Sequence, residues 1–248
     1  MSAAAPTRRI VVRLRRLGVF AAAGVLIAAG LVGWAYWRVH GRTLIEFRIY
    51  QNSEMIQFSD FGEPPQFAIW LEDPETDRLQ TVFVTRRSAT GDWEGKAECP
   101  AALPRWFEVY REETGKDGLP TPDAPAPDAV TGATPTAGQF ACRIEVEPGS
   151  RWICWIEVNI AADFSEKHPQ YNEQTGIEDT HMSGQPSLLY RGEVEAVVGA
   201  QITPAPYGQT LPDTLRGEMK ASLDDITTAR DIFTSVEIRV IRPPVKLF

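Results

Sequence analysis

The chain has 248 residues, of which 43% are hydrophobic, and its 33 Asp and Glu outnumber its 25 Lys and Arg. That apolar content can build a folded core, and the length suits one large β-rich domain or two small ones. The charge is unevenly placed: residues 1–42 hold seven arginines and no acidic residue, so every carboxylate lies beyond them. Such an acidic surface repels phosphate backbones and argues against nucleic acid as a partner.

The first element in chain order is an uncharged run of 21 residues, Leu17 to Trp37, behind an arginine-rich tail. A helix of this length reaches about 31 Å, the thickness of a bilayer hydrocarbon core. We therefore predict a transmembrane helix over residues 17–37 that crosses the lipid bilayer. By the positive-inside rule, the basic tail 1–16 stays in the cytoplasm and residues 43–248 form an extracytoplasmic domain.

A cleaved signal peptide is the alternative for this segment. Gly33 and Ala35 precede Tyr36 in a small-x-small arrangement that a signal peptidase could cut. Signal peptides usually have an apolar core of about 7–15 residues, shorter than the run here. The length favours a retained anchor.

Alternating apolar and polar residues predict strands along most of the remaining chain. Thr43–Tyr50 is the first of them. Gln66–Leu71 and Leu79–Thr85 flank a polar, proline-containing turn and predict a β-hairpin. Two later runs, 188–200 and 232–242, are also β-rich. Many short strands separated by turn signals predict an all-β, antiparallel β-sandwich.

A second hairpin is predicted over Phe140–Val146 and Trp152–Ile160, which a Pro-Gly turn joins. The apolar residues of both strands are even-numbered, so Cys142 and Cys154 share a face and lie opposite or one step diagonal. In an oxidising compartment the two could form a disulfide, or they could stay buried thiols that pack as small apolar residues. With three cysteines in the chain, at least one thiol is left over.

Helix signals are few. Leu103–Glu112 carries large apolar residues at a spacing of three to four and predicts one short helix packed against the sheet. Glu218–Ala229 is polar and predicts a helical turn or a loop. Residues 119–138 contain five prolines and predict an extended or flexible loop.

Inside that loop lies the sequence Asp128-Ala129-Val130-Thr131-Gly132-Ala133-Thr134. It resembles the Asp-x-x-Ser/Thr-Gly-Ala-Thr/Ser motif at which bacterial flavin transferases attach FMN, through its phosphate, to the last hydroxyl. The resemblance implies covalent FMN on Thr134 and a flavin transferase as a partner. The recognised residues would be Asp128, Thr131, Gly132 and Ala133.

The flavin motif departs from the usual pattern in one respect. In FMN-carrying domains the motif leads into a helix, whereas here residues 135–138 lead into a strand. The alternative is a tight turn in which Asp128 or Thr131 caps backbone N–H groups and no cofactor is bound.

Four blocks spread over residues 43–242 resemble a bacterial family of predicted periplasmic proteins of unknown function. They are Pro65–Asp73, Asp128–Thr134, Gly184–Gly192 and Thr227–Ile232. The resemblance implies an Ig-like sandwich fold and an association with PepSY-type membrane reductases and flavin transferases. We therefore expect a single-pass protein of the bacterial inner membrane whose periplasmic domain is an accessory or binding module of a flavin- or iron-linked redox system. The alternative is an electron-transfer protein that carries FMN on Thr134.

Signatures of catalysis are missing from the sequence. It contains no Gly-x-Ser-x-Gly, His-Glu-x-x-His, phosphate-binding P-loop or dinucleotide glycine motif, so no catalytic residue is nominated and a non-enzymatic role is favoured. His168 and His181 lie with five carboxylates in a polar loop that could chelate a metal. The spacing matches no known metal site, so a solvated acidic loop is favoured and no metal ligand is nominated.

Overall fold

A computed structural model of the chain describes residues 24–34, 36, 42–57, 64–92, 102–126, 130–132, 138–210 and 217–244. The chain divides into two units, one made of Met1–Arg42 and Arg242–Phe248 and the other of Thr43–Ile241. In the first unit, residues 24–34 are helical and exposed to solvent. No helix within the described ranges is both long and apolar enough to cross a bilayer. The tail 1–16 and positions 17–23, 35 and 37 of the predicted transmembrane helix lie outside the described residues.

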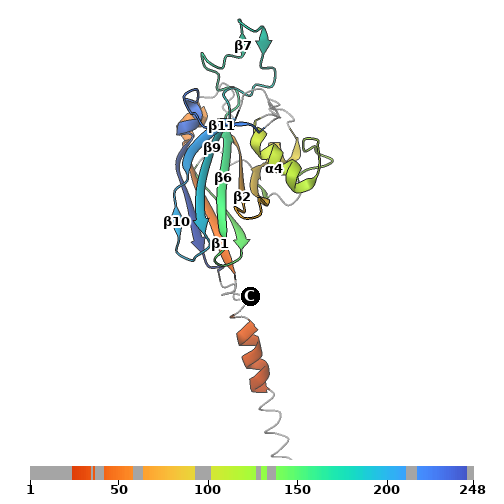
Figure 1. The fold of residues 1–248 in the computed structure, drawn as a ribbon, viewed down its shortest axis with the longest axis vertical. Coiled ribbons are helices and arrows are strands. Elements are labelled where there is room, and N and C mark those ends of the chain that lie inside the picture. Colours follow the sequence, from red (N-terminus) through yellow and green to blue (C-terminus); the bar gives the residue numbers. More distant parts are fainter. Residues whose placement is uncertain are drawn as a thin grey trace, which may run out of the picture. The chain divides into compact units, whose positions relative to one another are not determined.

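The second unit is built mainly of β-strands arranged in two large sheets (Figure 1). The smaller sheet has the order β10 (Gln201–Ile202), β13 (Phe233–Ile241), β1 (Thr43–Gln51), β5 (Gly138–Val146). The larger sheet has the order β12 (Met219–Lys220), β11 (Ala205–Thr210), β9 (Leu188–Glu195), β6 (Arg151–Asn159), β2 (Gln66–Glu72), β3 (Leu79–Thr85), β4 (Val130–Gly132). Between the strands that the structure describes, the pairings are antiparallel except that of β4 with β3, which is parallel.

The two sheets pack face to face around one apolar core. On β1, the alternate residues Ile45, Phe47 and Ile49 are fully buried in this core. On β2, Phe67, Ile69 and Leu71 enter the same core from the other sheet. The predicted antiparallel, mostly β fold is therefore confirmed, because period-2 alternation places one face of each strand inward.

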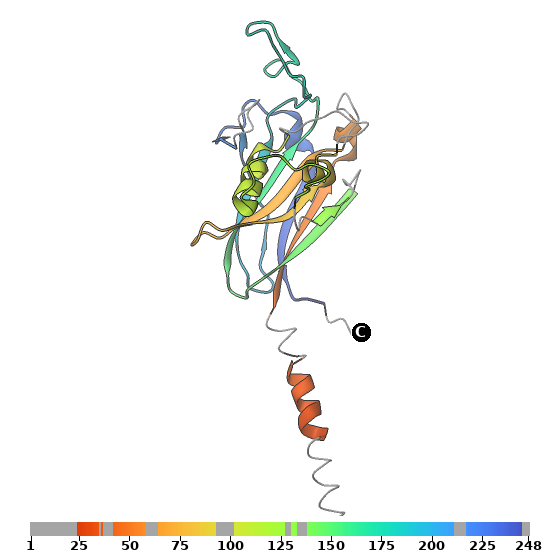
Figure 2. The same ribbon diagram turned by 90° about the vertical axis from the view of Figure 1, so that its right-hand side faces the viewer.

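A helical layer covers the outer face of the larger sheet. The principal helix is α4 (Pro104–Thr114), which lies against this sheet (Figures 1 and 2). Its Trp106, Phe107 and Tyr110 are buried in one apolar cluster with Trp70 of β2. Strand β2 is therefore buried on both faces. The predicted short helix is confirmed, since its apolar spacing of three to four supplies the face that α4 buries.

The remaining helical turns are α2 (Ser53–Gln57), α3 (Arg86–Thr90) and the 3₁₀ turn η1 (Thr228–Asp231). The polar segment from residue 218 contains β12 and η1. Residues 169–181 form an arm that carries the two-stranded β7 (Tyr171–Asn172) and β8 (Ile177–Glu178) and projects from the sandwich (Figures 1 and 2).

The predicted β2–β3 hairpin is confirmed by the pairing of the two strands. The predicted hairpin of residues 140–160 is wrong. Strand β5 pairs with β1 in the smaller sheet, whereas β6 pairs with β2 and β9 in the larger sheet. The turn between them carries the chain across the sandwich. Both strands have one apolar face, and alternation alone cannot tell a hairpin from two strands that face each other across a core.

Cys142 and Cys154 lie on different sheets and both enter the core between them. They are free thiols, with 9% and 0% of the residue exposed. Burial raises the pKa of both thiols, because a thiolate loses its hydration there. Of the two predicted alternatives, a disulfide or two buried thiols, the structure shows the buried thiols. Cys99 lies outside the described residues.

Candidate functional site

Buried polar side chains gather at one end of the sandwich, which we call the loop end. Here β1, β3 and β6 finish while β2, β9 and β13 begin, as the pairs Gln66–Asn159 and Gln51–Phe233 show. The buried polar residues at or within a few residues of this end are Gln51, Gln66, Thr85, Glu157, Asn159, Asp163, Gln185, Ser187, Gln209 and Thr210. Buried polar groups are costly unless bonded, so their gathering marks this end as the place to look for a site.

The segment with the predicted flavin motif joins the two sheets at this end. Thr131 and Gly132 lie on β4, which is the last strand of the larger sheet, and pair with Val84 and Thr85 of β3. The next described residue after Gly132 is Gly138, which pairs with Gln51 in the smaller sheet. Asp128, Ala133 and Thr134 lie outside the described residues.

A pocket of about 210 Å³ lies beside β3, between α3, the first turn of α4 and the segment 119–121. We call it the α3–α4 pocket. It is lined by Ser88, Gly91, Leu103, Trp106, Phe107, Leu119, Pro120 and Thr121. Of these described residues, five have apolar or aromatic side chains and two carry hydroxyl groups.

One wall of the pocket depends on Gly91. It ends α3 with φ +63°, and a Cβ at this position would overlap the backbone of Pro120. Glycine is therefore required both for the left-handed conformation and for the close approach of the two segments. The segment is held further by the hydrogen bond from Ala126 N to Ala89 O, at 2.8 Å.

A short polar network connects the pocket with β4. The hydroxyl of Thr85 donates to Gln66 Oε1 at 2.7 Å, and the hydroxyl of Ser88 donates to the same oxygen at 3.3 Å. Ser88 lines the pocket, whereas Thr85 is the neighbour of Gly132 on β4. Two hydrogen bonds thus join the pocket wall to Thr85 of β3, the strand that pairs with β4.

Glu157 of β6 holds the beginning of α4. Its carboxylate accepts hydrogen bonds from Arg105 N at 3.2 Å, Trp106 N at 2.7 Å and Ser187 Oγ at 2.5 Å. Ser187 is also 2.8 Å from the hydroxyl of Thr210. Glu157 is completely buried, and loss of hydration raises its pKa to about 7 although its hydrogen bonds favour the ionised form.

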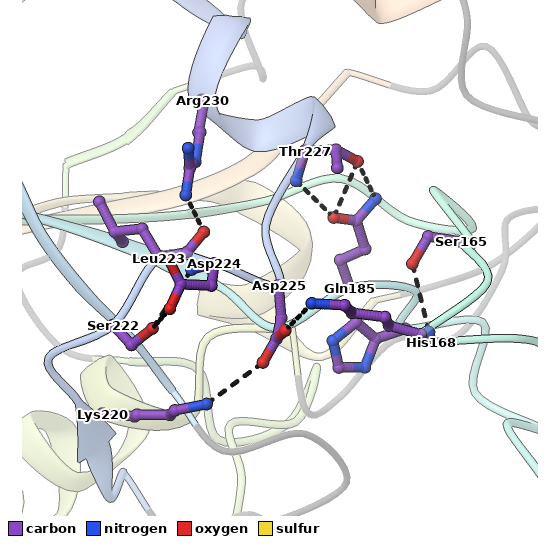
Figure 3. Close-up of polar contacts among 11 residues, drawn as sticks. Ser165, His168, Gln185, Lys220, Ser222, Leu223, Asp224, Asp225, Thr227 and Arg230 are labelled. Carbon is purple, nitrogen blue, oxygen red and sulfur yellow. Dashed lines mark hydrogen bonds and ion pairs between the residues drawn. The ribbon is translucent and has the colours of Figure 1, made fainter.

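Asp163 plays a comparable part at the base of the arm. Its Oδ1 accepts from Gln185 N at 2.7 Å and its Oδ2 accepts from the hydroxyl of Thr228. Gln185 in turn binds Thr227, whose backbone N–H donates to Gln185 Oε1 at 2.8 Å (Figure 3). Burial raises the pKa of Asp163 to about 7. This carboxyl joins three loops to one another.

The exposed part of this region is an ion cluster. Asp225 binds both Lys167 and Lys220, and Figure 3 shows its contact with Lys220. The hydrogen bonds from the two lysines, together with their charges, lower the pKa of Asp225 to about 2. Within the described part of the chain, no group of three or more His, Cys, Asp or Glu side chains is placed to hold a metal ion. His168 is tied into the loop through its backbone N–H, which donates to the hydroxyl of Ser165 at 3.2 Å.

The sequence predictions missed the α3–α4 pocket and both buried carboxyls. One signal was present: Glu157 interrupts the apolar run Trp152–Ile160, and a glutamate buried in a strand needs partners. The pocket left no signal, because it is formed where α3, α4 and residues 119–121 meet through tertiary contacts.

Comparison with known proteins gives no match to a family model, a curated protein or a solved structure. The function is therefore inferred from the geometry of the loop end.

Proposed function

We propose that residues 43–241 form a non-enzymatic binding module with an Ig-like sandwich, whose binding site is the α3–α4 pocket. The observation that carries this proposal is the placement of Glu157 and Asp163. A carboxyl with a pKa of about 7 is the usual candidate for a general acid or base at neutral pH. Glu157 is 0% exposed and Asp163 is 6% exposed, and both bind backbone N–H groups. These carboxyls therefore serve the fold, and none of the described residues that line the α3–α4 pocket has an ionisable side chain.

The Ig-like assignment is supported by the path of the chain. It passes from the smaller sheet at β1 to the larger at β2, returns at β5 and crosses again at β6. Repeated crossing between two antiparallel sheets is typical of Greek-key sandwiches.

The proposed setting is the periplasmic side of a bacterial inner membrane, with residues 17–37 as a single anchor in the lipid bilayer. Residues 1–42 are basic and the rest of the chain is acidic, and this difference in charge supports the orientation. We propose that the module is an accessory of a flavin- or iron-linked redox system and that its partner is a PepSY-type membrane reductase.

Two measurements test this setting. Protease added to spheroplasts is expected to digest residues beyond about 43 and to leave the arginine-rich end protected. The tagged chain, co-expressed with a PepSY-type reductase, is expected to retain the reductase in mild detergent. In the control protein, residues 43–248 are fused to an unrelated membrane anchor. This control should retain the reductase as well as the parent chain does. A soluble product starting near Tyr36 refutes the anchor, and a reductase that is expressed but never retained refutes the partner.

The second candidate function is a covalent flavoprotein modified at Thr134 by a flavin transferase. The position of Thr131 and Gly132 favours it, because they lie in extended backbone on the last strand of the larger sheet. An enzyme can reach such an edge more easily than a central strand. Under this alternative, Thr134→Ala abolishes in-gel flavin fluorescence, Thr131→Ala keeps the acceptor hydroxyl, and Asp128→Asn lowers the modification. A non-fluorescent parent excludes it, provided that the transferase labels a control substrate.

A further inference from the structure

The backbone is strained where the arm of residues 169–181 leaves the sandwich. Ala162 and Met182 have φ of +56° and +55°, in the left-handed region that non-glycine residues rarely adopt. Among the described residues, Asp77 is the one other non-glycine residue with a positive φ. Ala162 N donates to Met182 O at 2.8 Å, so the two strained positions are joined directly. Strained backbone persists only where surrounding contacts hold it, and it concentrates at clamps and switch segments.

The position of the arm depends on this base. Figures 1 and 2 show that the arm stands clear of the two large sheets. Its strands β7 and β8 have two residues each, and Tyr171 and Ile177 on them are exposed. A two-stranded hairpin of this size is at best marginally stable by itself in water. The contacts at the base therefore decide where the arm lies.

A buried polar cluster closes the base beside the strained pair. Asp163 is 6% exposed, and its Oδ1 accepts from Gln185 N at 2.7 Å while its Oδ2 accepts from the hydroxyl of Thr228. Gln185 Nε2 donates back to Asp163 O at 2.7 Å. The chain that leaves for the arm, the chain that returns from it and η1 are thus tied together by one carboxyl. None of these hydrogen-bond partners of Asp163 carries a positive charge.

Other titratable and charged side chains lie on the segments that meet at Asp163. On the side of the arm they are Glu166, Lys167, His168, Asp179 and His181. On the side of η1 they are Asp224, Asp225, Arg230 and Asp231. Lys167 pairs with Asp225, and Asp179 accepts from the backbone N–H groups of His181 and Gly184. Burial raises the pKa of Asp163 to about 7, against the hydrogen bonds from Thr228 and Gln185, which lower it.

From the strained pair and the cluster beside it we infer that the base of the arm is a proton-controlled hinge. In the closed state Asp163 is protonated and the contacts described above are in place. Protonation keeps both contacts, because one oxygen still accepts from Gln185 N while the O–H donates to the hydroxyl oxygen of Thr228. In the released state Asp163 has given its proton to the solvent, water surrounds the carboxylate, and the arm moves about Ala162 and Met182.

The direction of the pH effect follows from the two states of Asp163. Its carboxyl titrates near pH 4 when water surrounds it, as an ordinary aspartate does, and near pH 7 in the closed base. Between these values the closed state holds a proton that the released state has lost. Raising the pH through this window therefore favours release, by up to about tenfold per pH unit, and the effect levels off above pH 7.

Hydrogen–deuterium exchange of the purified full chain tests the hinge. Rates are expressed as protection factors, so that the intrinsic pH dependence of exchange is removed. The amides of Ala162 and Gln185 report the base, and the amide of Phe47 on β1, a strand that is paired on both sides, reports global unfolding. We expect the two base amides to be less protected than Phe47 at every pH. Their protection should fall by about tenfold to hundredfold between pH 5 and pH 7 and stay level from there to pH 8.

Matched variants assign the proton and the strain. Asp163→Asn resembles the protonated carboxyl and cannot ionise, so protection of the base should vary by less than about threefold from pH 5 to pH 8. The double variant His168→Gln with His181→Gln should keep the fall that the parent shows. Ala162→Gly relieves the left-handed strain in the closed state and should raise protection of the base about fivefold or more at each pH.

Four results would overturn the inference. Base amides as well protected as Phe47 would show that the base opens only when the whole domain unfolds. Constant protection between pH 5 and pH 7 would show that no proton controls the opening. An Asp163→Asn variant with the slope of the parent, or a histidine variant without it, would place the proton elsewhere. Unchanged protection in Ala162→Gly would remove the strained hinge. If Asp163→Asn does not fold, the comparisons on the parent chain and on the histidine variant still decide.

Discussion

The carboxylate of Glu157 on β6 accepts a hydrogen bond of 2.7 Å from the backbone N–H of Trp106 in the first turn of α4. The helix has no capping side chain of its own, because Leu103 stands at the N-cap. Free N–H groups and the helix dipole at this end favour a negative charge. Glu157 supplies the acceptor oxygens for these N–H groups from the sheet, and so fixes the turn that forms one wall of the α3–α4 pocket.

Replacement of Glu157 by Gln should destabilise the domain. The amide keeps one acceptor oxygen, but its NH₂ group faces donors that the carboxylate had satisfied. Leaving such groups unpaired costs about 1–3 kcal/mol of unfolding free energy, measured by urea titration. The matched control is Glu178→Gln on the exposed strand β8. This substitution should change the unfolding free energy by less than about 0.5 kcal/mol. A Glu157→Gln variant that unfolds at the same urea concentration as the parent would contradict the capping role of Glu157.

Stability should fall as the pH rises from about 4 to 7. Ordinary carboxyls titrate near pH 4, whereas Glu157 and Asp163 have a pKa of about 7 in the folded domain. Within this window the folded state holds protons that the unfolded chain has released. Raising the pH therefore removes stability, at up to about 1.4 kcal/mol per pH unit for each group, and the effect levels off above pH 7.

Urea titrations at pH 5, 6, 7 and 8 measure this slope. The double variant Glu157→Gln with Asp163→Asn should show a flatter profile than the parent, because neither amide titrates. The same slope in both proteins would show that other groups cause it.

The regular elements were the predictable part of this fold. Alternation in β1 and the spacing of Trp106, Phe107 and Tyr110 in α4 express local periodicity, which a sequence displays directly. The crossing between β5 and β6 was not predictable, because a strand's inward face does not reveal which sheet it joins. The same holds for Glu157, whose partners in α4 lie about fifty residues earlier in the chain.

The candidate site was not predicted from the sequence. The motif that ends in Thr134 suggested a modification, but the pairing of its Gly132 with Thr85 of β3 was not foreseeable. A pocket formed where α3, α4 and the segment 119–121 meet depends on tertiary contacts that leave no pattern in the sequence.

Gly184→Ala should be more costly than Gly176→Ala. Both glycines have positive φ, +72° and +69°, so each substitution costs about 1 kcal/mol for the backbone conformation. At Gly184 the new Cβ would also overlap Asp163, with the backbone nitrogen of Asp163 only 2.7 Å away. At Gly176 the nearest atom is Tyr171 Oη at 4.0 Å. Equal unfolding free energies of the two variants would contradict the tight base of the arm.

Cys142 and Cys154 should resist alkylation in the native protein. Both are buried, and burial raises the pKa of each thiol, so little thiolate forms at neutral pH. Mass spectrometry after brief treatment with iodoacetamide should find both unmodified, and treatment in urea should modify both. A disulfide between them in a non-reducing peptide map would contradict the structure.

The intact mass of the chain, purified after co-expression with an active flavin transferase, tests the central claim most directly. The proposed binding module predicts the mass of the unmodified chain while a control substrate in the same cells is labelled. A mass increase equal to FMN less one water, mapped to Thr134, would contradict it and establish a covalent flavoprotein.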